Sequence, residues 1–484
     1  MLKNNHYNQV FINVGLGVLM MTSLTALAEQ SVQSGEILTF KQAIKVAQQH
    51  DPWLKGNRHQ QQAIESASIS ANTLPDPKIS VGMGSLPTDS FDLNQEGMTQ
   101  LKIGVSQMIP RGDTLKFKSQ QLQLESEMYP YQRLDRAAKV AVTVGGLWLD
   151  AYRVQQSVVL IEKNRSLFEQ LADVAEASYS STLGKTRQQD IVRAQLELTR
   201  LEERLDKLAQ QKNKYDGMLL QWLTRFASAN HTVDDAALYS DLSWHDIALS
   251  QQLPSIDLLN SNLVYAENWL KPQDLVPFFY PHPAVIAVDK KVNATKTGIK
   301  LAKQKYKPEW GVNASYGYRA DDPMGQNRAD LFSVGVTFDL PIFTENRQDQ
   351  DVRSAVSKTE AIKTEKLLLL RQLLGAYSSA KGRLLRVKER QNLYNTKLLP
   401  QIHDQAEASL TAYTNDDGDF AEVVRARIAV LNAEIDDLTL NVEEQKIHLE
   451  LNYLFIGGIK TAMTENNLNV TNSSQYAAMS GERE

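Results

Sequence analysis

A block marked by prolines occurs twice in this chain of 484 residues, and it limits the possible folds more than any other feature. Each proline of the first block has a counterpart in the second at the same offset of 231 (283 − 52, 308 − 77 and 341 − 110), in the pairs Pro52 and Pro283, Pro77 and Pro308, and Pro110 and Pro341. Around the third proline, Gly104-Val105-Ser106 aligns with Gly335-Val336-Thr337. Solenoid repeats are about 20 to 50 residues long. This longer repeat therefore predicts an internally duplicated chain with two similar halves.

Residues 1–28 have the features of a secretory signal peptide. Lys3 provides a positive start, the stretch from Val10 to Leu27 is mostly apolar, and Ala26-Leu27-Ala28 is a small-x-small cleavage site. The alternative is an N-terminal membrane anchor. We expect a mature chain that begins near Glu29 and lies outside the cytoplasm. Beyond this segment the sequence has no run of eighteen apolar residues.

Composition argues against several classes of protein. The formal net charge is −5, which provides no positive field for nucleic acid. There are 0 cysteines, so no disulfide, thiolate metal site or cysteine nucleophile can form. The histidines are scattered without the close spacing of a zinc site, and no phosphate-binding loop is present. We therefore expect a protein that is not an enzyme and has no cofactor and no metal site.

Two hairpins of alternating apolar and polar residues are predicted, at 78–109 and 309–340. In the first hairpin, Ile79, Val81 and Met83 alternate with glycine, serine and lysine, and the second strand follows the same rule. Polar loops at 85–99 and 319–330 connect the strands. Each half thus contributes two strands with one apolar face and one face of small or polar residues.

Long helices follow each hairpin, over 113–178 and 187–225 in the first half (29–225) and over 345–412 and 419–456 in the second half (282–456). A helix of about 65 residues is roughly 100 Å long. Pro130 and Pro400 are expected to kink the longer ones. The 187–225 helix carries a heptad seam that is typical of a coiled coil, at Ile191, Ala194, Leu198, Leu201, Leu205 and Leu208. A helix precedes each hairpin, 226–281 connects the halves, and 457–484 is expected to be disordered.

The strand pattern is typical of a transmembrane barrel, with lipid outside and water inside. Four strands are too few to close a barrel, since about eight is the smallest number that does. We therefore expect other copies of the chain to complete it. A soluble four-stranded sheet beside the helices is the alternative, but the abundance of glycine and serine on the polar face favours a water-filled lumen.

Taken together, these features resemble the TolC family of outer-membrane efflux ducts over Leu38 to about Ile456. The resemblance is carried by the secretory signal, the doubled halves, the proline after each second strand, and a Tyr-x-x-x-x-Gly break in the helices at Tyr179 to Gly184 and Tyr413 to Gly418. It implies an α+β membrane protein that forms a homotrimer. Three chains would build a twelve-stranded barrel in the outer membrane and a periplasmic α-barrel of antiparallel coiled-coil helices. It also implies two partners, a periplasmic adaptor (membrane fusion) protein and an inner-membrane RND pump.

The resemblance further places the periplasmic entrance at the two helix breaks, where the family is narrowed by side chains that are often carboxylates. The matching positions after the second break are Glu422 and Arg425, and Asp190 corresponds to Glu422 in the first half. Arg425 replaces the family's more common second carboxylate. Three further carboxylates add negative charge to the second tip, namely Asp416, Asp417 and Asp419. In a trimer such charges would form a concentrated ring, although solvated loop charges explain them equally well.

Three segments look most like the branch of the family that works with heavy-metal pumps, namely Leu74-Pro75-Asp76-Pro77, Gln107-Met108-Ile109-Pro110-Arg111-Gly112-Asp113 and Asp190-Ile191-Val192-Arg193-Ala194-Gln195. The resemblance therefore implies passive exit of heavy-metal cations. A duct for drugs, bile salts or a type I secreted protein is the alternative. A periplasmic coiled-coil structural or adaptor protein is a different class, and it would not need strand pairs that face lipid.

Overall fold

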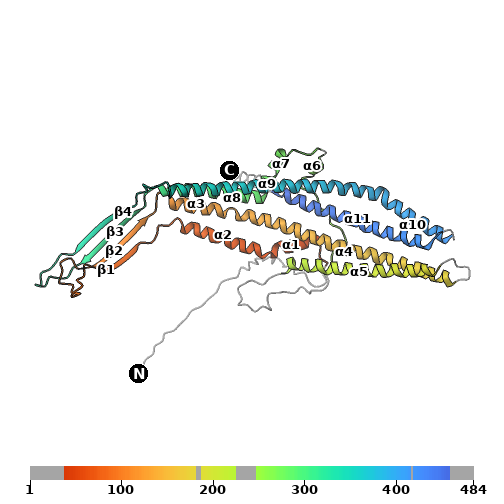
Figure 1. Cartoon of the computed structure of the whole chain (residues 1–484), viewed down its shortest axis with the longest axis horizontal. Coiled ribbons are helices and arrows are strands. Elements are labelled where there is room, and N and C mark those ends of the chain that lie inside the picture. Colours follow the sequence, from red (N-terminus) through yellow and green to blue (C-terminus); the bar gives the residue numbers. More distant parts are fainter. Residues whose placement is uncertain (1–36, 181–186, 225–246, 267, 416–417, 458–484) are drawn as a thin grey trace, which may run out of the picture.

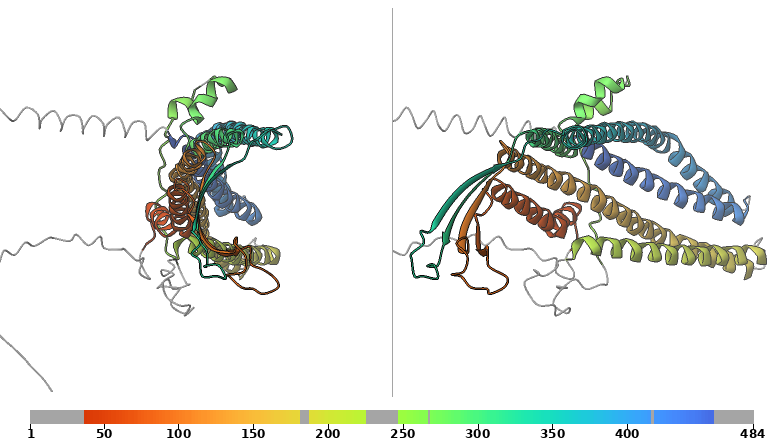
Figure 2. Two further views of the ribbon diagram at one scale, coloured as in Figure 1. Left: turned by 90° about the vertical axis from the view of Figure 1, so that its left-hand side faces the viewer. Right: turned by 60° about the vertical axis from the view of Figure 1, so that its left-hand side comes forward.

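The computed structural model describes residues 37–180, 187–224, 247–266, 268–415 and 418–457. The expected signal peptide, residues 226–246 of the connector and residues 458–484 of the tail lie outside the described residues. A four-stranded antiparallel sheet occupies one end of an elongated molecule, and long helices run from it to the other end (Figure 1). Viewed along its length, the molecule is a curved wall (Figure 2).

The first half begins with two shorter helices and continues through a hairpin into two long helices. Its elements are α1 (Phe40–His50), α2 (Pro52–Ser70), β1 (Lys78–Gly84), β2 (Gln100–Ile109), α3 (Thr114–Ser126), α4 (Tyr129–Ser180) and α5 (Gln188–Leu223). A capping box starts α1: Thr39 Oγ1 accepts a hydrogen bond from the Gln42 amide, and the Gln42 side chain accepts one from the Thr39 amide.

The second half has the same order of helix, hairpin and long helices after a short connecting region. Its elements are α6 (Ser261–Val264), α7 (Pro272–Phe279), α8 (Pro283–Lys303), η2 (Gln304–Tyr306), β3 (Trp310–Tyr318), β4 (Leu331–Phe338), α9 (Gln348–Leu393), η3 (Tyr394–Leu398), α10 (Leu399–Thr414) and α11 (Phe420–Leu454). The helix that opens each proline-marked block also begins in the same way, with a side-chain cap from the residue before the proline. Asp51 Oδ1 accepts from the Trp53 amide at 3.0 Å, and His282 Nδ1 accepts from the Ala284 amide at 3.2 Å.

Both long stretches expected to be single kinked helices depart from a regular α-helix near a proline, which removes a backbone donor. The helix expected over 113–178 is two helices, because α3 ends at Ser126, four residues before Pro130. Pro130 has no N–H to bond the Ser126 carbonyl, so the helical ladder stops there. In the second half, the π-helical turn η3 comes directly before α10, which has Pro400 in its first turn. This stretch remains helical but is irregular at the proline.

Three large apolar clusters in the described part of the chain hold most of the helices together. Near the middle, Trp148 is fully buried, donates to the Leu38 carbonyl at 3.0 Å and packs edge-on against Phe40. The predicted seam of α5 packs against α4 and α11 in a second cluster that extends toward the far end, with Leu201 and Phe168 among its buried members. The third cluster joins α9, α11 and the connecting helices α6 and α7. These interfaces fix the wall that carries the sheet at one end and two helix tips at the other.

Candidate functional site

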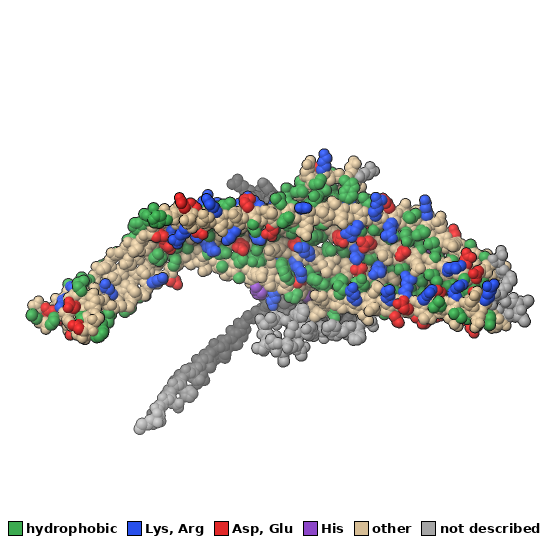
Figure 3. Space-filling view, viewed as in Figure 1, with side chains coloured by type: hydrophobic (Ala, Val, Ile, Leu, Met, Phe, Trp, Pro, Cys, Tyr) green, Lys and Arg blue, Asp and Glu red, His purple; other side chains and the backbone are tan. Residues whose placement is uncertain are grey.

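The register of the sheet places its apolar side chains on one face. Val81 pairs with Ile103, Ile103 with Tyr316, and Tyr316 with Phe332, so one apolar row crosses all four strands. These side chains are exposed, with Phe332 71% accessible. Charged side chains are dense over the helices and sparse over the strands (Figure 3). An apolar surface of this extent normally marks contact with lipid or with another protein.

The opposite face is small and polar. A second row runs from Ser80 through Gly104 and Ser315 to Ser333. Polar side chains lie close to the glycine backbones on this face. A Cβ atom added at Gly104 would meet Ser80 Oγ at 2.8 Å, and one added at Gly335 would meet Asn313 Oδ1 at 2.8 Å. The two faces therefore suit two different environments.

Both edges of the sheet are open within the described residues. The strand order is β1-β2-β3-β4, so β1 and β4 each have one neighbour and one free row of backbone donors and acceptors. Free edges of long strands are templates for pairing with another chain. The sequence did not reveal that β2 and β3, which belong to different halves, pair continuously from Leu101 with Tyr318 to Ile109 with Trp310.

Two arginines of the second loop hold the first loop in place beyond the sheet. Arg319 Nη1 donates to the Gly97 carbonyl at 3.1 Å while its Nε donates to the Ala329 carbonyl at 2.7 Å. Arg328 Nη1 donates to the Glu96 carbonyl at 3.2 Å. The two loops that connect the strands, 85–99 and 319–330, are thus tied together within one chain.

At the opposite end of the strands, Arg111 links the two halves. Its Nη1 donates to the Lys307 carbonyl at 3.1 Å, and its guanidinium also pairs with Asp339 and lies 3.9 Å from a Glu309 oxygen. Gly112 has a φ of +46°, a conformation that favours glycine, and a Cβ atom there would meet Lys307 Cδ at 2.3 Å. The turn from β2 into α3 is therefore locked onto the second half.

The second helix tip is described around the break between α10 and α11. Asp419 Oδ1 accepts from the Ala421 amide at 3.2 Å and starts α11, while the rings of Tyr413 and Phe420 pack edge-on at 5.6 Å. A Cβ atom at Gly418 would lie 2.6 Å from the Tyr413 amide nitrogen. This close approach is the physical reason for glycine five residues after tyrosine.

The predicted entrance residues have different environments. Glu422 and Arg425 are exposed on the first turns of α11. Asp190 is 5% exposed, and its Oδ2 accepts from the Arg187 amide at 3.0 Å at the start of α5, so its carboxylate has a local structural partner. Tyr179 is exposed at the end of α4. Gly184, Asp416 and Asp417 lie outside the described residues.

Sequence reasoning missed a buried lysine in α9. Lys381 is 1% exposed, its Nζ donates to the Ala266 carbonyl at 3.0 Å and to the Leu263 carbonyl at 3.4 Å, and it lies 5.1 Å from the Trp269 ring centroid. Burial lowers its pKa. Its burial could have been inferred from its position four residues after Tyr377, which places it on the apolar face of the helix.

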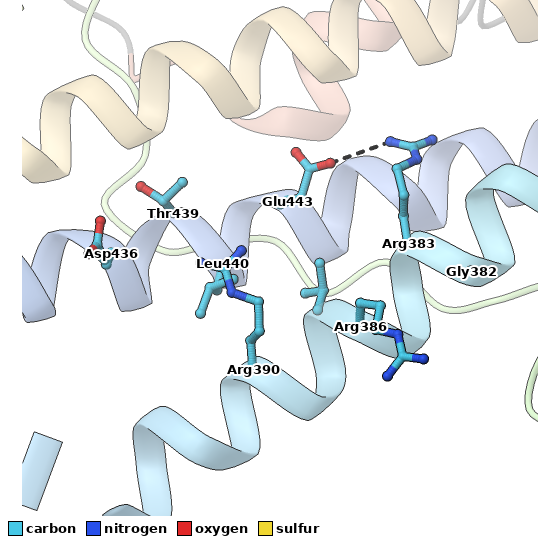
Figure 4. Close-up of a pocket in the computed structure, with 9 residues that line it drawn as sticks. Gly382, Arg383, Arg386, Arg390, Asp436, Thr439, Leu440 and Glu443 are labelled. Carbon is cyan, nitrogen blue, oxygen red and sulfur yellow. Dashed lines mark hydrogen bonds and ion pairs between the residues drawn. The ribbon is translucent and has the colours of Figure 1, made fainter. Parts of the chain in front are cut away.

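A groove of about 530 Å³ lies between α9 and α11 (Figure 4). Arg383 spans it and reaches a Glu443 oxygen at 3.4 Å, whereas Arg386 and Arg390 lie along α9. Asp436 comes from α11 on the other side. Three arginines and two carboxylates, Asp436 and Glu443, therefore line this groove, so most of its positive charge is opposed.

Two negative observations apply to the described residues alone. No group of three or more histidine or acidic side chains there is arranged to hold a metal ion. None of the helices there is long and apolar enough to cross a membrane.

Comparison with solved structures places this geometry among known folds. The chain superposes on CusC, described as forming a transmembrane channel, with a TM-score of 0.65 and 12% identity over 86% of this chain and 91% of that chain. The chain has the fold of outer-membrane channels. The Campylobacter jejuni CmeC outer membrane channel gives a TM-score of 0.66 and 12% identity over 93% and 94% of the two chains. The outer membrane protein VceC from Vibrio cholerae gives 0.64 and 13% over 86% and 95%. No protein-family model and no curated protein sequence matches the chain.

Proposed function

We propose that this protein is the outer-membrane exit duct of a tripartite efflux system and conducts its substrate passively. The observation that carries the proposal is the sheet, which has one exposed apolar face, one face of small polar residues and two free edges. Such a sheet needs lipid on one side, water on the other, and further strands at both edges. The shared fold with outer-membrane channels supports the same conclusion.

In this proposal three copies pair β4 of one chain with β1 of the next. Twelve strands then close a barrel, and the helices form a periplasmic tunnel that receives substrate from an adaptor and an RND pump. The internal duplication suits this arrangement, because a ring of near-equal halves needs similar hairpins at regular intervals. The signal peptide would direct the chain out of the cytoplasm.

A pair of neighbouring substitutions on β4 tests the membrane placement. Val334→Arg adds a charge to the apolar face, which costs about 2–4 kcal/mol where that face meets the middle of a bilayer. Ser333→Arg adds the same charge to the opposite face and is the matched control. We expect the first variant to be depleted from the outer-membrane fraction and the second to assemble as trimers in native mass measurements. A monomeric periplasmic protein would instead favour the coiled-coil structural class.

Heavy-metal cations are the proposed substrate. Three sequence segments support this assignment through their resemblance to the metal-exporting branch, and drugs, bile salts or a secreted protein are the competing cargo. A deletion strain should become sensitive to copper, silver, zinc or cobalt while its sensitivity to detergents and dyes stays unchanged. Equal tolerance of mutant and parent to all four metals, in a strain without a second duct, would reject the metal assignment and leave the duct itself untouched.

The entrance is proposed to lie at the two helix tips, where Glu422 and Arg425 would surround the opening in a trimer. Their exposure on α11 supports this role. The acidic residues Asp416, Asp417 and Asp419 would add charge nearby. Asp190 is buried, and one of its carboxylate oxygens accepts from the Arg187 amide at the start of α5, so it would contribute differently from the exposed pair.

A further inference from the structure

A second groove, of about 390 Å³, lies between α4 and α5 with Ile435 of α11 also lining it. Its charged lining is mostly basic. Arg153 comes from α4, and Arg200, Arg204 and Lys207 come from α5, against the single carboxylate of Glu203. The excess of positive charge distinguishes this groove from the rest of a chain whose net charge is −5.

The groove matches the one between α9 and α11 in position but not in charge. Arg204, Lys207 and Gln211 on α5 correspond to Asp436, Thr439 and Glu443 on α11, since the three pairs share one offset of 232 (436 − 204, 439 − 207 and 443 − 211). A cation thus stands in place of a carboxylate in the first pair and of a neutral threonine in the second, and a neutral glutamine stands in place of a carboxylate in the third. The duplicated halves present two grooves with different chemical preferences.

The cations of the basic groove are only partly neutralised within the chain. Arg200 pairs with Glu197 of its own helix at 2.5 Å, and Arg204 donates to the neutral Asn432 amide oxygen at 2.7 Å. In the part of the chain that the structure describes, the side chains of Arg153 and Lys207 have no hydrogen bond or ion pair. Uncompensated charge at a groove favours an anionic partner.

The spacing of the row on α5 indicates the shape of that partner. Arg200, Arg204, Lys207 and Gln211 follow at steps of four, three and four, so they share one face of the helix. At 1.5 Å per residue the row is about 16 Å long. It is therefore far longer than one small anion and matches about three turns of a helix that carries carboxylates at the same steps.

We propose that the groove between α4 and α5 docks an acidic α-helical segment of a partner protein, whereas the groove between α9 and α11 does not. The proposal rests on the proposed function only for the presence of partners along the helical wall. It adds to that function the chemical character of the partner and the half of the chain that selects it.

Two synthetic helical peptides test the proposal on the purified full chain in neutral detergent. Both are alanine-rich, about 20 residues long and equal in charge. One carries glutamate at steps of four, three and four, and the other carries the same glutamates spread around the helix. We expect the phased peptide to bind at least about fivefold more tightly in fluorescence anisotropy, with affinity falling as salt rises.

Matched charge reversals then locate the site. Lys207→Glu should weaken binding of the phased peptide about tenfold, and the neutral Lys207→Gln should weaken it about threefold. Arg390→Glu, an exposed residue of the other groove, should change the affinity less than about twofold. Equal binding of the two peptides, equal losses in both grooves, or no binding at all would overturn the proposal. Failure of the proposed function would appear separately, as absence of the protein from the outer membrane.

Discussion

The buried ammonium of Lys381 provides a quantitative test of how the connecting region is held on the helical wall. Lys381→Met keeps a long apolar side chain but removes the donor to the Ala266 and Leu263 carbonyls. Hydrogen bonds from charged donors contribute about 1.5–3 kcal/mol each, and the contact with Trp269 adds about 0.5–2 kcal/mol. Losing the ammonium also removes its burial cost of several kcal/mol. We expect a net loss of about 2 kcal/mol.

Limited proteolysis measures this loss of stability locally, in the connecting region that Lys381 holds on the helical wall. Local opening by about 2 kcal/mol corresponds to about 30-fold faster cleavage when cleavage proceeds from the open state. The cuts should fall within 247–281 and be mapped by mass spectrometry. Arg386→Met is the control, because Arg386 is exposed on the same helix and pairs only with Glu389 in the described part of the chain. Equal cleavage rates in Lys381→Met and the unmodified chain would refute the reasoning.

Three further outcomes are expected. Gly418→Ala should destabilise the second tip by about 1–3 kcal/mol, because the added Cβ would overlap the Tyr413 backbone. Gly375→Ala should instead stabilise its helix by about 0.5–1 kcal/mol, because a Cβ there meets nothing within 4 Å. Thermal unfolding should show a lower midpoint for the first variant and a higher midpoint for the second. Glu422→Ala should leave the trimer intact and raise single-channel conductance, and an unchanged conductance would exclude a gating role. Burial lowers the pKa of His448 in the folded chain, so on acidification the imidazole is protonated in the unfolded chain before it is protonated in the folded one. The free energy of unfolding should therefore fall as the pH drops below about 6.5. In His448→Gln this contribution to the loss of stability in acid should disappear.

Local features of the fold were predictable because each depends on residues close in sequence. The alternation at Ile79, Val81 and Met83 specified a strand and its apolar face, and the Thr39 capping box specified the start of α1. Proline chemistry located the irregular points at Pro130 and Pro400, although the first is a full break. A removed backbone donor can be read from the sequence, but neighbouring contacts decide whether a helix bends or stops.

Features that join distant segments were not predictable in the same way. The pairing of β2 with β3 depends on how two halves that are far apart in the sequence dock, and no local pattern encodes its register. The burial of Lys381 depends on α6 and the segment after it, which cover α9. The hydrogen bond from the Arg187 amide to Asp190 at the start of α5 is likewise visible only in the structure, and the place of Asp190 at the entrance stays a prediction.

The two junctions between strand and long helix show how the duplicated halves have diverged. Arg111 follows β2 and is bound by the second half of the same chain, whereas Ile342, its counterpart at the offset of the prolines (342 − 111), follows β4 and is 66% exposed next to an exposed Phe343. The ion pair and hydrogen bonds of Arg111 join two halves that belong to one chain and are always adjacent. The apolar counterpart lies at the free edge of the sheet, where burial requires another molecule, since exposed apolar side chains are stabilised only when removed from water. The same block therefore closes one junction within the chain and leaves the other available for the neighbouring copy in the proposed trimer.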